Sequence, residues 1–395
     1  MKTSYPIRQI FLDSFEDYLP EHTVSTQQLR AANAIMNCKT GSLGVNSSIC
    51  EECGHVEIHN SSCRNRHCPN CQSVLKEVWI DQRQSEVLDA KYFHFVFTVP
   101  HDLNQLFLAN QKLLYSLLHQ AAAQTLLTLA RDRKYLGATP GIIQVLHTWG
   151  QKLDYHPHIH CIISGAGLSR DGKLRKCGKR FFIPVLAASK MFRGKFLAGL
   201  KHYRSTGELR LPKSFTESPD SVNWQELIDR LYQTDWVAYI KETFNGNGNA
   251  ISYLGRYTHR VAISNGRILD VTDDTVTFRY RDYQDHNALK EMTLSKDEFI
   301  RRFLMHILPK GFQKIRYFGF LAGPVKKKKL TILFRLQGYK SFKARFSKDT
   351  PKEELLQALG FDVRTCPCCG KQTMRFIGRS FHFRSLPQLN SIFDF

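Results

Sequence analysis

A run of alternating histidines constrains this chain more than any other feature. Residues 154–160 read Asp-Tyr-His-Pro-His-Ile-His. Alternate residues of a strand face the same side, so His156, His158 and His160 are predicted to line one face of a sheet. Pro157 cannot donate a ladder hydrogen bond, which places it at the start or the edge of that strand. Three alternating imidazoles are hard to bury without an ion, and we therefore predict a divalent metal site here.

The segments around this run predict a mixed α+β fold with antiparallel strands. The aromatic and β-branched residues 92–99 predict a strand. Residues 105–131 have the apolar spacing of a long amphipathic helix. Residues 141–147 and 158–164 are two further predicted strands, and the polar link 149–155 joins them as an antiparallel pair.

Two cysteine pairs predict a structural zinc site near the N-terminus. Cys50 and Cys53 form one Cys-x-x-Cys turn, and Cys68 and Cys71 form a second one 14 residues later. Each turn directs two thiolates toward a point about 2.3 Å away, and two such turns make the tetrahedral site that Zn²⁺ prefers. In a reducing compartment, clustered cysteines are more typical of metal ligands than of disulfides.

Other residues near these pairs keep the ligand set and its role open. Cys63, His55 and His67 could each replace one of the four predicted zinc ligands. Arg64 and Arg66 lie between the two pairs, on a loop that a metal would hold rigid, and we predict that they contact DNA. The alternative is a purely structural zinc module with a solvated loop.

The C-terminal region contains a half-complete cysteine motif. Cys366, Cys368 and Cys369 form one turn of the same type, followed by glycine, but no second pair lies nearby in the sequence. His382 is the closest histidine, so the sequence leaves open whether an ion binds here. Cys38 lies outside the paired motifs and is more typical of a buried thiol.

The charge of the chain indicates a polyanionic partner. It has 56 Lys+Arg against 35 Asp+Glu over 395 residues, a formal net charge of +21. Hydrophobic residues make up 42%, which excludes a disordered basic protein. Nucleic acid is the commonest partner of such a chain, and an acidic membrane surface is the alternative. No apolar stretch reaches the about 18 residues of a spanning helix, and the N-terminus lacks a signal-peptide core, so we expect a cytoplasmic protein.

Shifts in composition predict three consecutive domains, at residues 1–90, 91–290 and 291–395. The first would be helical and zinc-binding, the second the core that carries the histidine strand, and the third a basic region. Within the core, residues 170–235 are irregular and rich in Lys, Arg, Ser and Pro, which is typical of an insertion. Asn265-Gly266, between two apolar runs, predicts a hairpin turn.

A pair of tyrosines is the second feature that stands out in the sequence. Tyr253 and Tyr257 are four residues apart and share one face of a predicted helix, on which Arg256 and Arg260 form a parallel basic row. Paired tyrosines at this spacing usually only pack against their neighbours. Their interest here comes from a basic chain that also carries a histidine strand.

Taken together, these motifs resemble the two-tyrosine, HUH-class rolling-circle transposases of bacterial insertion sequences, the IS91 family. The family signature combines His-hydrophobe-His with a tyrosine helix. His158-Ile-His160 fits the first part, and Tyr253 with Tyr257 fits the second. The resemblance runs from the cysteine module to the tyrosines and so covers most of the chain. It departs slightly at Ala166, where a third glycine is common.

The resemblance implies a ferredoxin-like antiparallel sheet, with the histidines on a central strand and the tyrosines on a helix packed over it. It also implies that a tyrosine hydroxyl attacks a phosphodiester of single-stranded DNA, at the element ends and the target, and leaves a 5′-phosphotyrosine. Phenol ionises only near pH 10, so a cation near the phosphate is needed. Mg²⁺ or Mn²⁺ held by His158 and His160 fits that need. We favour Gln151 as the third ligand, with His147 and His156 as rivals.

Two other functions fit parts of the sequence. A zinc-dependent nucleic-acid-binding regulator would explain the charge and the cysteines, but it leaves the tyrosine pair unused. A metal-dependent hydrolase would need a carboxylate base near the histidines, and Asp154 is the close candidate. The sequence does not indicate an oligomeric state.

Overall fold

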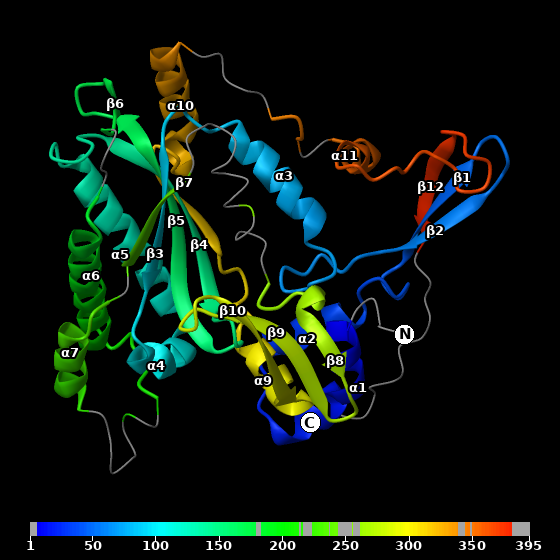
Figure 1. The fold of residues 1–395 in the computed structure, drawn as a ribbon, viewed down its shortest axis with the longest axis horizontal. Helices are drawn as coiled ribbons and strands as arrows, with labels where there is room; N and C mark the ends of the chain where they lie inside the picture. The colour runs from blue at the N-terminus through cyan, green and yellow to red at the C-terminus, as the bar shows by residue number, and fades with distance from the viewer. Residues whose placement is uncertain are drawn as a thin grey trace. The chain divides into compact units, whose positions relative to one another are not determined.

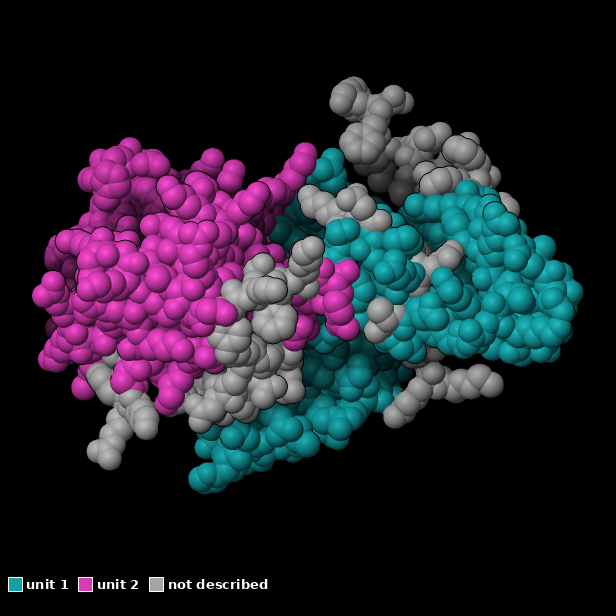
Figure 2. Space-filling view, turned by 90° about the horizontal axis from the view of Figure 1, so that it is seen from above, with its two compact units in different colours: residues 1–77, 263–307, 346–395 teal, residues 78–262, 308–345 magenta. Residues whose placement is uncertain are grey.

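The computed structural model describes residues 6–178, 183–212, 215, 223–236, 238–243, 255, 261–338, 344–347 and 350–380. The chain forms two compact units, each assembled from separate segments (Figure 2). Unit 1 comprises residues 1–77, 263–307 and 346–395, and unit 2 comprises residues 78–262 and 308–345. This division differs from the three consecutive domains that we predicted, because composition along a chain cannot reveal which distant segments pack together. No helix in the described segments is long and apolar enough to cross a membrane.

Unit 2 is built around one antiparallel sheet. The strands hydrogen-bond in the order β11-β4-β5-β3-β7, and β6 pairs with β5 outside this path. Every ladder in the sheet is antiparallel. The strands are β3 (Tyr92–Thr98), β4 (Thr139–Trp149), β5 (Tyr155–Leu168), β6 (Leu174–Lys176), β7 (Ala238–Thr243) and β11 (Ile315–Gly319).

The order of the elements makes this a ferredoxin-like fold, and the predicted α+β class is confirmed. Two helices follow β3, the hairpin β4–β5 comes next, and two more helices lead into β7. Strands in the spatial order β4-β5-β3-β7 with this connectivity form the β-α-β-β-α-β arrangement. These helices are α4 (Asn104–Ala109), α5 (Gln111–Arg131), α6 (Val185–Ser205) and α7 (Trp224–Gln233). Residues 170–235 are therefore not an insertion, because α6 and α7 form the second crossover of the core.

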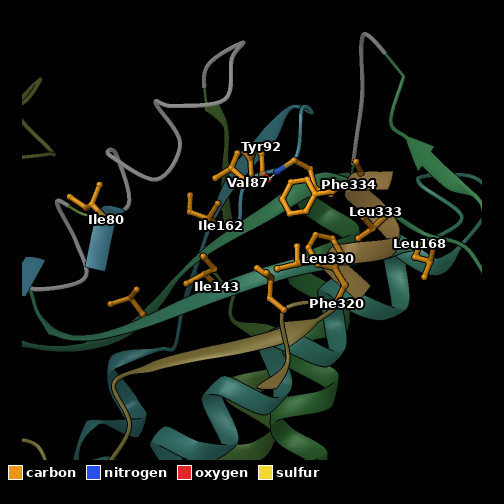
Figure 3. Close-up of a cluster of buried hydrophobic side chains, with 14 residues drawn as sticks. Ile80, Val87, Tyr92, Ile143, Ile162, Leu168, Phe320, Leu330, Leu333 and Phe334 are labelled. Atoms are coloured by element: carbon orange, nitrogen blue, oxygen red, sulfur yellow. Dashed lines mark hydrogen bonds between the residues drawn. The ribbon is translucent and has the colours of Figure 1, made fainter. Parts of the chain in front are cut away.

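The two faces of the sheet have different neighbours. Helices α5 and α6 pack against each other and over one face (Figure 1), where Phe95 and Phe97 are fully buried. The opposite face carries an apolar cluster, to which α10 (Gly323–Gln337) contributes Leu330 and Leu333 (Figure 3). The cluster includes Ile162 of β5, which by alternation shares its face with His158 and His160. The histidines thus lie on the face away from α5 and α6.

Unit 1 contains two further antiparallel sheets. One has the order β10-β9-β8 and packs with α1, α2 and α9, whose core includes the edge-on contact of Phe11 with Phe303. The other has the order β12-β1-β2 and carries cysteines. The elements of the first group are α1 (Pro6–Glu21), α2 (Thr26–Met36), β8 (Ile268–Val271), β9 (Thr275–Asp282), β10 (Ala288–Ser295) and α9 (Lys296–Met305). The remaining elements are β1 (Val45–Cys50), β2 (Val56–Asn60), α11 (Lys352–Ala358) and β12 (Met374–Ser380), and α3 (Ser73–Gln84) lies at the boundary with unit 2.

The hairpin predicted at Asn265-Gly266 is wrong. Residues Asn265–Arg267 form a single 3-10 turn, and β8 begins only after it. The Asn265 side chain accepts a hydrogen bond from the backbone of Ile7 at 3.3 Å and donates one to Asn70 at 2.6 Å. These contacts within unit 1 outweigh the local preference of the dipeptide for a type I′ turn.

Candidate active site and cysteine clusters

Three histidines converge on the face of the unit 2 sheet that lies opposite α5 and α6. The side-chain nitrogens of His147, His158 and His160 lie within 4.8 Å of one another, as for ligands of one ion. The ladder explains this, because His147 of β4 lies directly opposite His158 of β5, and His160 follows on the same face. The register shifts immediately beyond this pair, so a β-bulge ends the regular ladder at the site. His147 and His160 are buried, and His158 is half-buried.

Hydrogen bonds fix how two of these imidazoles face the common point. His158 donates from Nδ1 to the backbone carbonyl of His156 at 2.7 Å, so Nε2 is the nitrogen that would bind an ion. The Nδ1 of His160 lies 2.9 Å from Nε2 of the buried His94, on the neighbouring strand β3. Outer partners of this kind orient ligating histidines. His94 was missed in the sequence because it appears there only as one polar residue in an apolar strand.

The structure favours His147 over Gln151 as the third ligand. Gln151 lies in the turn that follows β4, two residues past the end of the strand at Trp149. His156 is not in the three-histidine group, and its ring lies 5.2 Å from that of His101. The bulge changes which residues of the two strands face each other, and Gln151 as a ligand stays a prediction.

Asp154, the candidate base of a hydrolase, is also outside the histidine group. Its carboxylate packs so closely on Gly150 that a Cβ at that glycine would overlap it. The Asp154 carboxylate is therefore packed inside the turn that connects β4 and β5.

The predicted nucleophiles Tyr253 and Tyr257 lie outside the described residues, as do Arg256 and Arg260. Gly255, between the two tyrosines in sequence, is described, and it is helical and buried. A Cβ built on Gly255 would lie 2.3 Å from Cδ1 of Ile80 on helix α3. This position therefore packs so closely on α3 that only glycine fits without movement.

Two other tyrosines near the histidine strand have a structural role. The hydroxyls of Tyr115 and Tyr155 hydrogen-bond to each other at 2.6 Å in the buried core. Burial raises the pKa of Tyr155 well above its usual value of about 10 and raises that of Tyr115 as well. Neither phenol is suited to act as a nucleophile.

The cysteines of unit 1 form two separate groups of four. One group consists of Cys38, Cys63, Cys68 and Cys71, and the other of Cys50, Cys53, Cys366 and Cys369. The single site predicted from Cys50, Cys53, Cys68 and Cys71 is therefore wrong, because its two turns belong to different groups. Cys63, considered as a spare donor, joins the first group. Cys38, expected to be an ordinary buried thiol, joins it too.

The first group has the features of a preformed metal site. The sulfurs of Cys63 and Cys71 are 3.7 Å apart. Backbone N–H groups point at the sulfurs, from Asn65 to Cys63 and from Asn70 to Cys68, both at 3.4 Å. Such donors stabilise thiolates, which are the form that binds zinc.

The loop with the predicted DNA-binding arginines belongs to this first group. Arg64 is exposed and adopts a left-handed backbone conformation, with a φ of 53°. Arg66 is half-buried, and burial lowers the pKa of its guanidinium. Asn65, between them, is held in place by Gln72, whose side chain donates to its carbonyl at 2.6 Å. Of the two arginines on this loop, Arg64 is therefore more exposed to solvent than Arg66.

Comparisons with known proteins match both parts of the chain. A family model described as a transposase zinc-binding domain matches residues 10–99, and one described as a putative transposase matches residues 141–329. The putative transposase y4qJ of Sinorhizobium fredii (strain NBRC 101917 / NGR234) is 41% identical over 373 residues, covering 93% of this chain and 94% of that protein. The transposase for insertion sequence element IS801 of Pseudomonas savastanoi pv. phaseolicola is 30% identical over 379 residues, covering 93% and 88%.

Among solved structures, the chain is similar to conjugative relaxase TrwC bound to DNA. The complex with a 27-mer carrying the recognition hairpin and the cleavage site has 14% identity and a TM-score of 0.23, covering 34% of this chain and 52% of that chain. A metal-bound TrwC complex has 12% identity and a TM-score of 0.23, covering 60% and 96%.

Proposed function

This chain belongs to the IS91 family of transposases, and from that premise we propose that it moves an insertion sequence by cutting and rejoining single-stranded DNA through a covalent phosphotyrosine. The observation that carries the proposal is the convergence of His147, His158 and His160 on one face of a ferredoxin-like sheet. We further propose that it acts in the cytoplasm on DNA, to which its net charge of +21 is suited.

The three imidazoles fit a divalent ion. Their nitrogens are close enough for one ion, and the Nδ1 hydrogen bond of His158 makes Nε2 the nitrogen that would bind it. A bound Mg²⁺ or Mn²⁺ would polarise the scissile phosphate and stabilise its negative charge. Imidazole is a softer donor than the oxygen ligands that Mg²⁺ prefers, so of the two we favour Mn²⁺.

Tyr253 or Tyr257 supplies the attacking oxygen in this proposal. The phenol oxygen attacks phosphorus in line and the phenol proton passes to solvent, while the bond from phosphorus to the 3′ oxygen breaks and that oxygen takes up a proton from solvent. The products are a 5′-phosphotyrosine and a free 3′-OH. Attack by the 3′-OH of another strand reverses the step and rejoins DNA without ATP. Two tyrosines allow two such linkages in succession, as strand transfer from donor to target requires.

The experiment is a search for a covalent protein–DNA adduct. The full chain is incubated with single-stranded DNA from an element end and Mn²⁺ or Mg²⁺, and an adduct that survives SDS is expected. Tyr253→Phe combined with Tyr257→Phe should abolish the adduct. Tyr283→Phe is the matched control, since Tyr283 is 66% exposed and lies in unit 1.

Each alternative predicts a different result. If the adduct forms without both tyrosines, the nucleophile is wrongly assigned. If DNA is cut but no adduct appears, a metal-dependent hydrolase is correct. If DNA is bound and never cut, the chain is a non-catalytic regulator.

A further inference from the structure

The second group of cysteines joins two turns that are 313 residues apart in the chain. Cys50-Glu-Glu-Cys53-Gly54 is one turn, and Cys366-Pro-Cys-Cys369-Gly370 is the other. The N-terminal turn lies within the matched zinc-binding domain, residues 10–99. The C-terminal turn lies outside both family matches, which end at residue 329.

The two turns have the same backbone geometry. In each, the closing glycine donates to the carbonyl of the first cysteine at 2.9 Å, with φ values of 71° at Gly54 and 72° at Gly370. The N–H of the first cysteine donates at 2.8 Å to the carbonyl five residues later, at His55 in one turn and Lys371 in the other. Two unrelated segments that repeat these hydrogen bonds indicate one local structure used twice.

The sulfurs of the two turns converge with the spacing of a tetrahedral zinc site. All four lie within 4.8 Å of one another. Cys50 is 3.6 Å from Cys369, and Cys53 is 3.7 Å from Cys366. Zinc–sulfur bonds of about 2.3 Å in a tetrahedron place neighbouring sulfurs about 3.8 Å apart. A disulfide would require about 2.05 Å, so these distances fit a shared ion and not a sulfur–sulfur bond.

The surroundings favour thiolates. The Thr373 hydroxyl lies 3.0 Å from the sulfur of Cys50, and the N–H groups of Cys53 and Cys368 point at the first sulfur of each turn at 3.5 and 3.4 Å. The two turns are also joined by ion pairs, from Lys371 to Glu52 and from Arg375 to Glu51. Donors to the sulfurs of Cys50 and Cys366 lower the cost of holding four thiolates together.

The sheet that carries these turns has almost no apolar core. Strand β12 pairs with β1, placing Met374 opposite Cys50, and the buried cluster consists of Cys50, Cys366 and Met374 with Cys369 against it. Val45 of the sheet is buried and Ile49 is half-buried, but four other large apolar side chains are 45% to 61% exposed: Val56, Ile58, Phe376 and Ile377. A three-stranded sheet with so small a core needs a metal or a disulfide for stability.

We propose that Cys50, Cys53, Cys366 and Cys369 bind a second Zn²⁺ ion, and that this ion fastens the C-terminal strand β12 to the N-terminal zinc-binding module. The inference does not depend on the tyrosine chemistry of the proposed function. It assigns a role to the C-terminal cysteine turn, whose partner is absent from the neighbouring sequence.

The test is the zinc content per chain of the purified full-length protein. Cys366→Ser should contain one zinc ion fewer than the wild type, and so should Cys53→Ser. The double variant should also lose one ion and not two, because both cysteines serve the same site. Cys368→Ser is the matched control, since Cys368 lies in the same turn but is exposed and outside the group. Any ion held by the histidines is common to all variants and cancels in the difference.

Two further measurements separate loss of a ligand from misfolding. Cys366→His replaces one zinc donor by another and should retain the ion. In the wild type loaded with Co²⁺, thiolate-to-metal absorption should have twice the intensity of a single four-cysteine centre, and Cys366→Ser should halve it. Equal zinc content in the wild type and Cys366→Ser, absorption of only one centre in the wild type, or a disulfide within this group would each overturn the proposal. None of these readouts involves DNA, so the proposed function would stand if the second zinc site failed.

Discussion

His147 is the residue whose ranking as a candidate metal ligand differs most between the sequence and the structure. In the sequence it is one buried position at the end of an apolar strand, ranked below Gln151. In the structure it lies opposite His158 and completes the three-imidazole group. Its ring also stacks on Trp149, with centroids 4.5 Å apart, so its position is fixed by packing as well as by the ladder.

Removal of His147 should therefore cost far more activity than removal of Gln151. Mutating outer partners of metal ligands costs about 10–100-fold in affinity or activity, so loss of a ligand should cost at least about 100-fold. We expect His147→Ala to lower adduct formation by that factor and to raise the Mn²⁺ concentration needed, whereas Gln151→Ala leaves both nearly unchanged. The measurement is adduct yield against Mn²⁺ concentration, and a larger effect of Gln151→Ala would restore the assignment made from sequence.

His119 is a buried histidine with no part in the site. It lies on α5, fully buried, with Nδ1 2.9 Å from the Gln144 amide. Burial, helped by the charge of Arg316, lowers its pKa to about 3. In the unfolded chain the pKa of histidine is about 6.5. Between these two values the unfolded state binds one more proton, so the free energy of unfolding falls as the pH falls.

Glutamine cannot titrate. The unfolding free energy of the His119→Gln variant should therefore depend less on pH than that of the wild type. Between pH 6.5 and 4.5 the wild type should lose about 2–3 kcal/mol more unfolding free energy than the variant. Urea unfolding followed by tryptophan fluorescence measures this for unit 2 alone, because all four tryptophans lie there: Trp79, Trp149, Trp224 and Trp236. Parallel pH curves for the two proteins would contradict the assignment.

At the scale of helices and strands, strand pairing determines which distant segments contact each other, and the local sequence pattern does not specify this. The antiparallel pairing of β4 with β5 was predicted from two apolar runs and a short polar link, and it is confirmed. The long helix predicted at 105–131 is confirmed in its extent but divides at Asn110 into α4 and α5. The side chain of Asn110 bonds to the backbone of Arg210, a contact between residues 100 apart that no helical period reveals.

Helix α3 should determine where the tyrosine segment lies, through the contact of Ile80 with Gly255. Gly255→Ala would put a methyl group 2.3 Å from Cδ1 of Ile80, so the Ile80 side chain or one of the two segments must move. We expect Gly255→Ala to lower adduct formation by about 100-fold, since a displacement of about 1 Å can cost that much. Ile80→Ala should restore much of the loss in the double variant by removing the atoms that clash.

The single variant Ile80→Ala is the control, because it opens a cavity without moving the tyrosines and should mainly lower stability. Adduct yield of the four proteins forms a double-mutant cycle. If the loss of adduct yield in the double variant equals the combined losses of the two single variants, the Gly255–Ile80 contact does not position the nucleophile.

At the scale of the whole molecule, the chain does not divide where its composition changes. Each unit is assembled from segments that are separate in the chain, and unit 1 includes both the N-terminal module and the C-terminal strand β12. The Lys326–Lys329 run, assigned by sequence to a basic C-terminal region, begins helix α10 of unit 2, where Lys326 pairs with Glu86 at 2.7 Å. Net charge predicted the kind of partner and gave no information about these boundaries.

The sequence by itself determined the features that repeat over a few residues. Alternation placed His158 and His160 on one face of a strand, and the spacing of each Cys-x-x-Cys turn directed two thiolates to one point. Tertiary structure alone decided how these half-sites are completed: His147 joins through the register of a hairpin, and Cys366 with Cys369 joins Cys50 with Cys53 through strand pairing. The physical reason is that one turn or strand segment can offer only two ligands to an ion. The others come from whichever segment the sheet brings opposite, however distant in the chain.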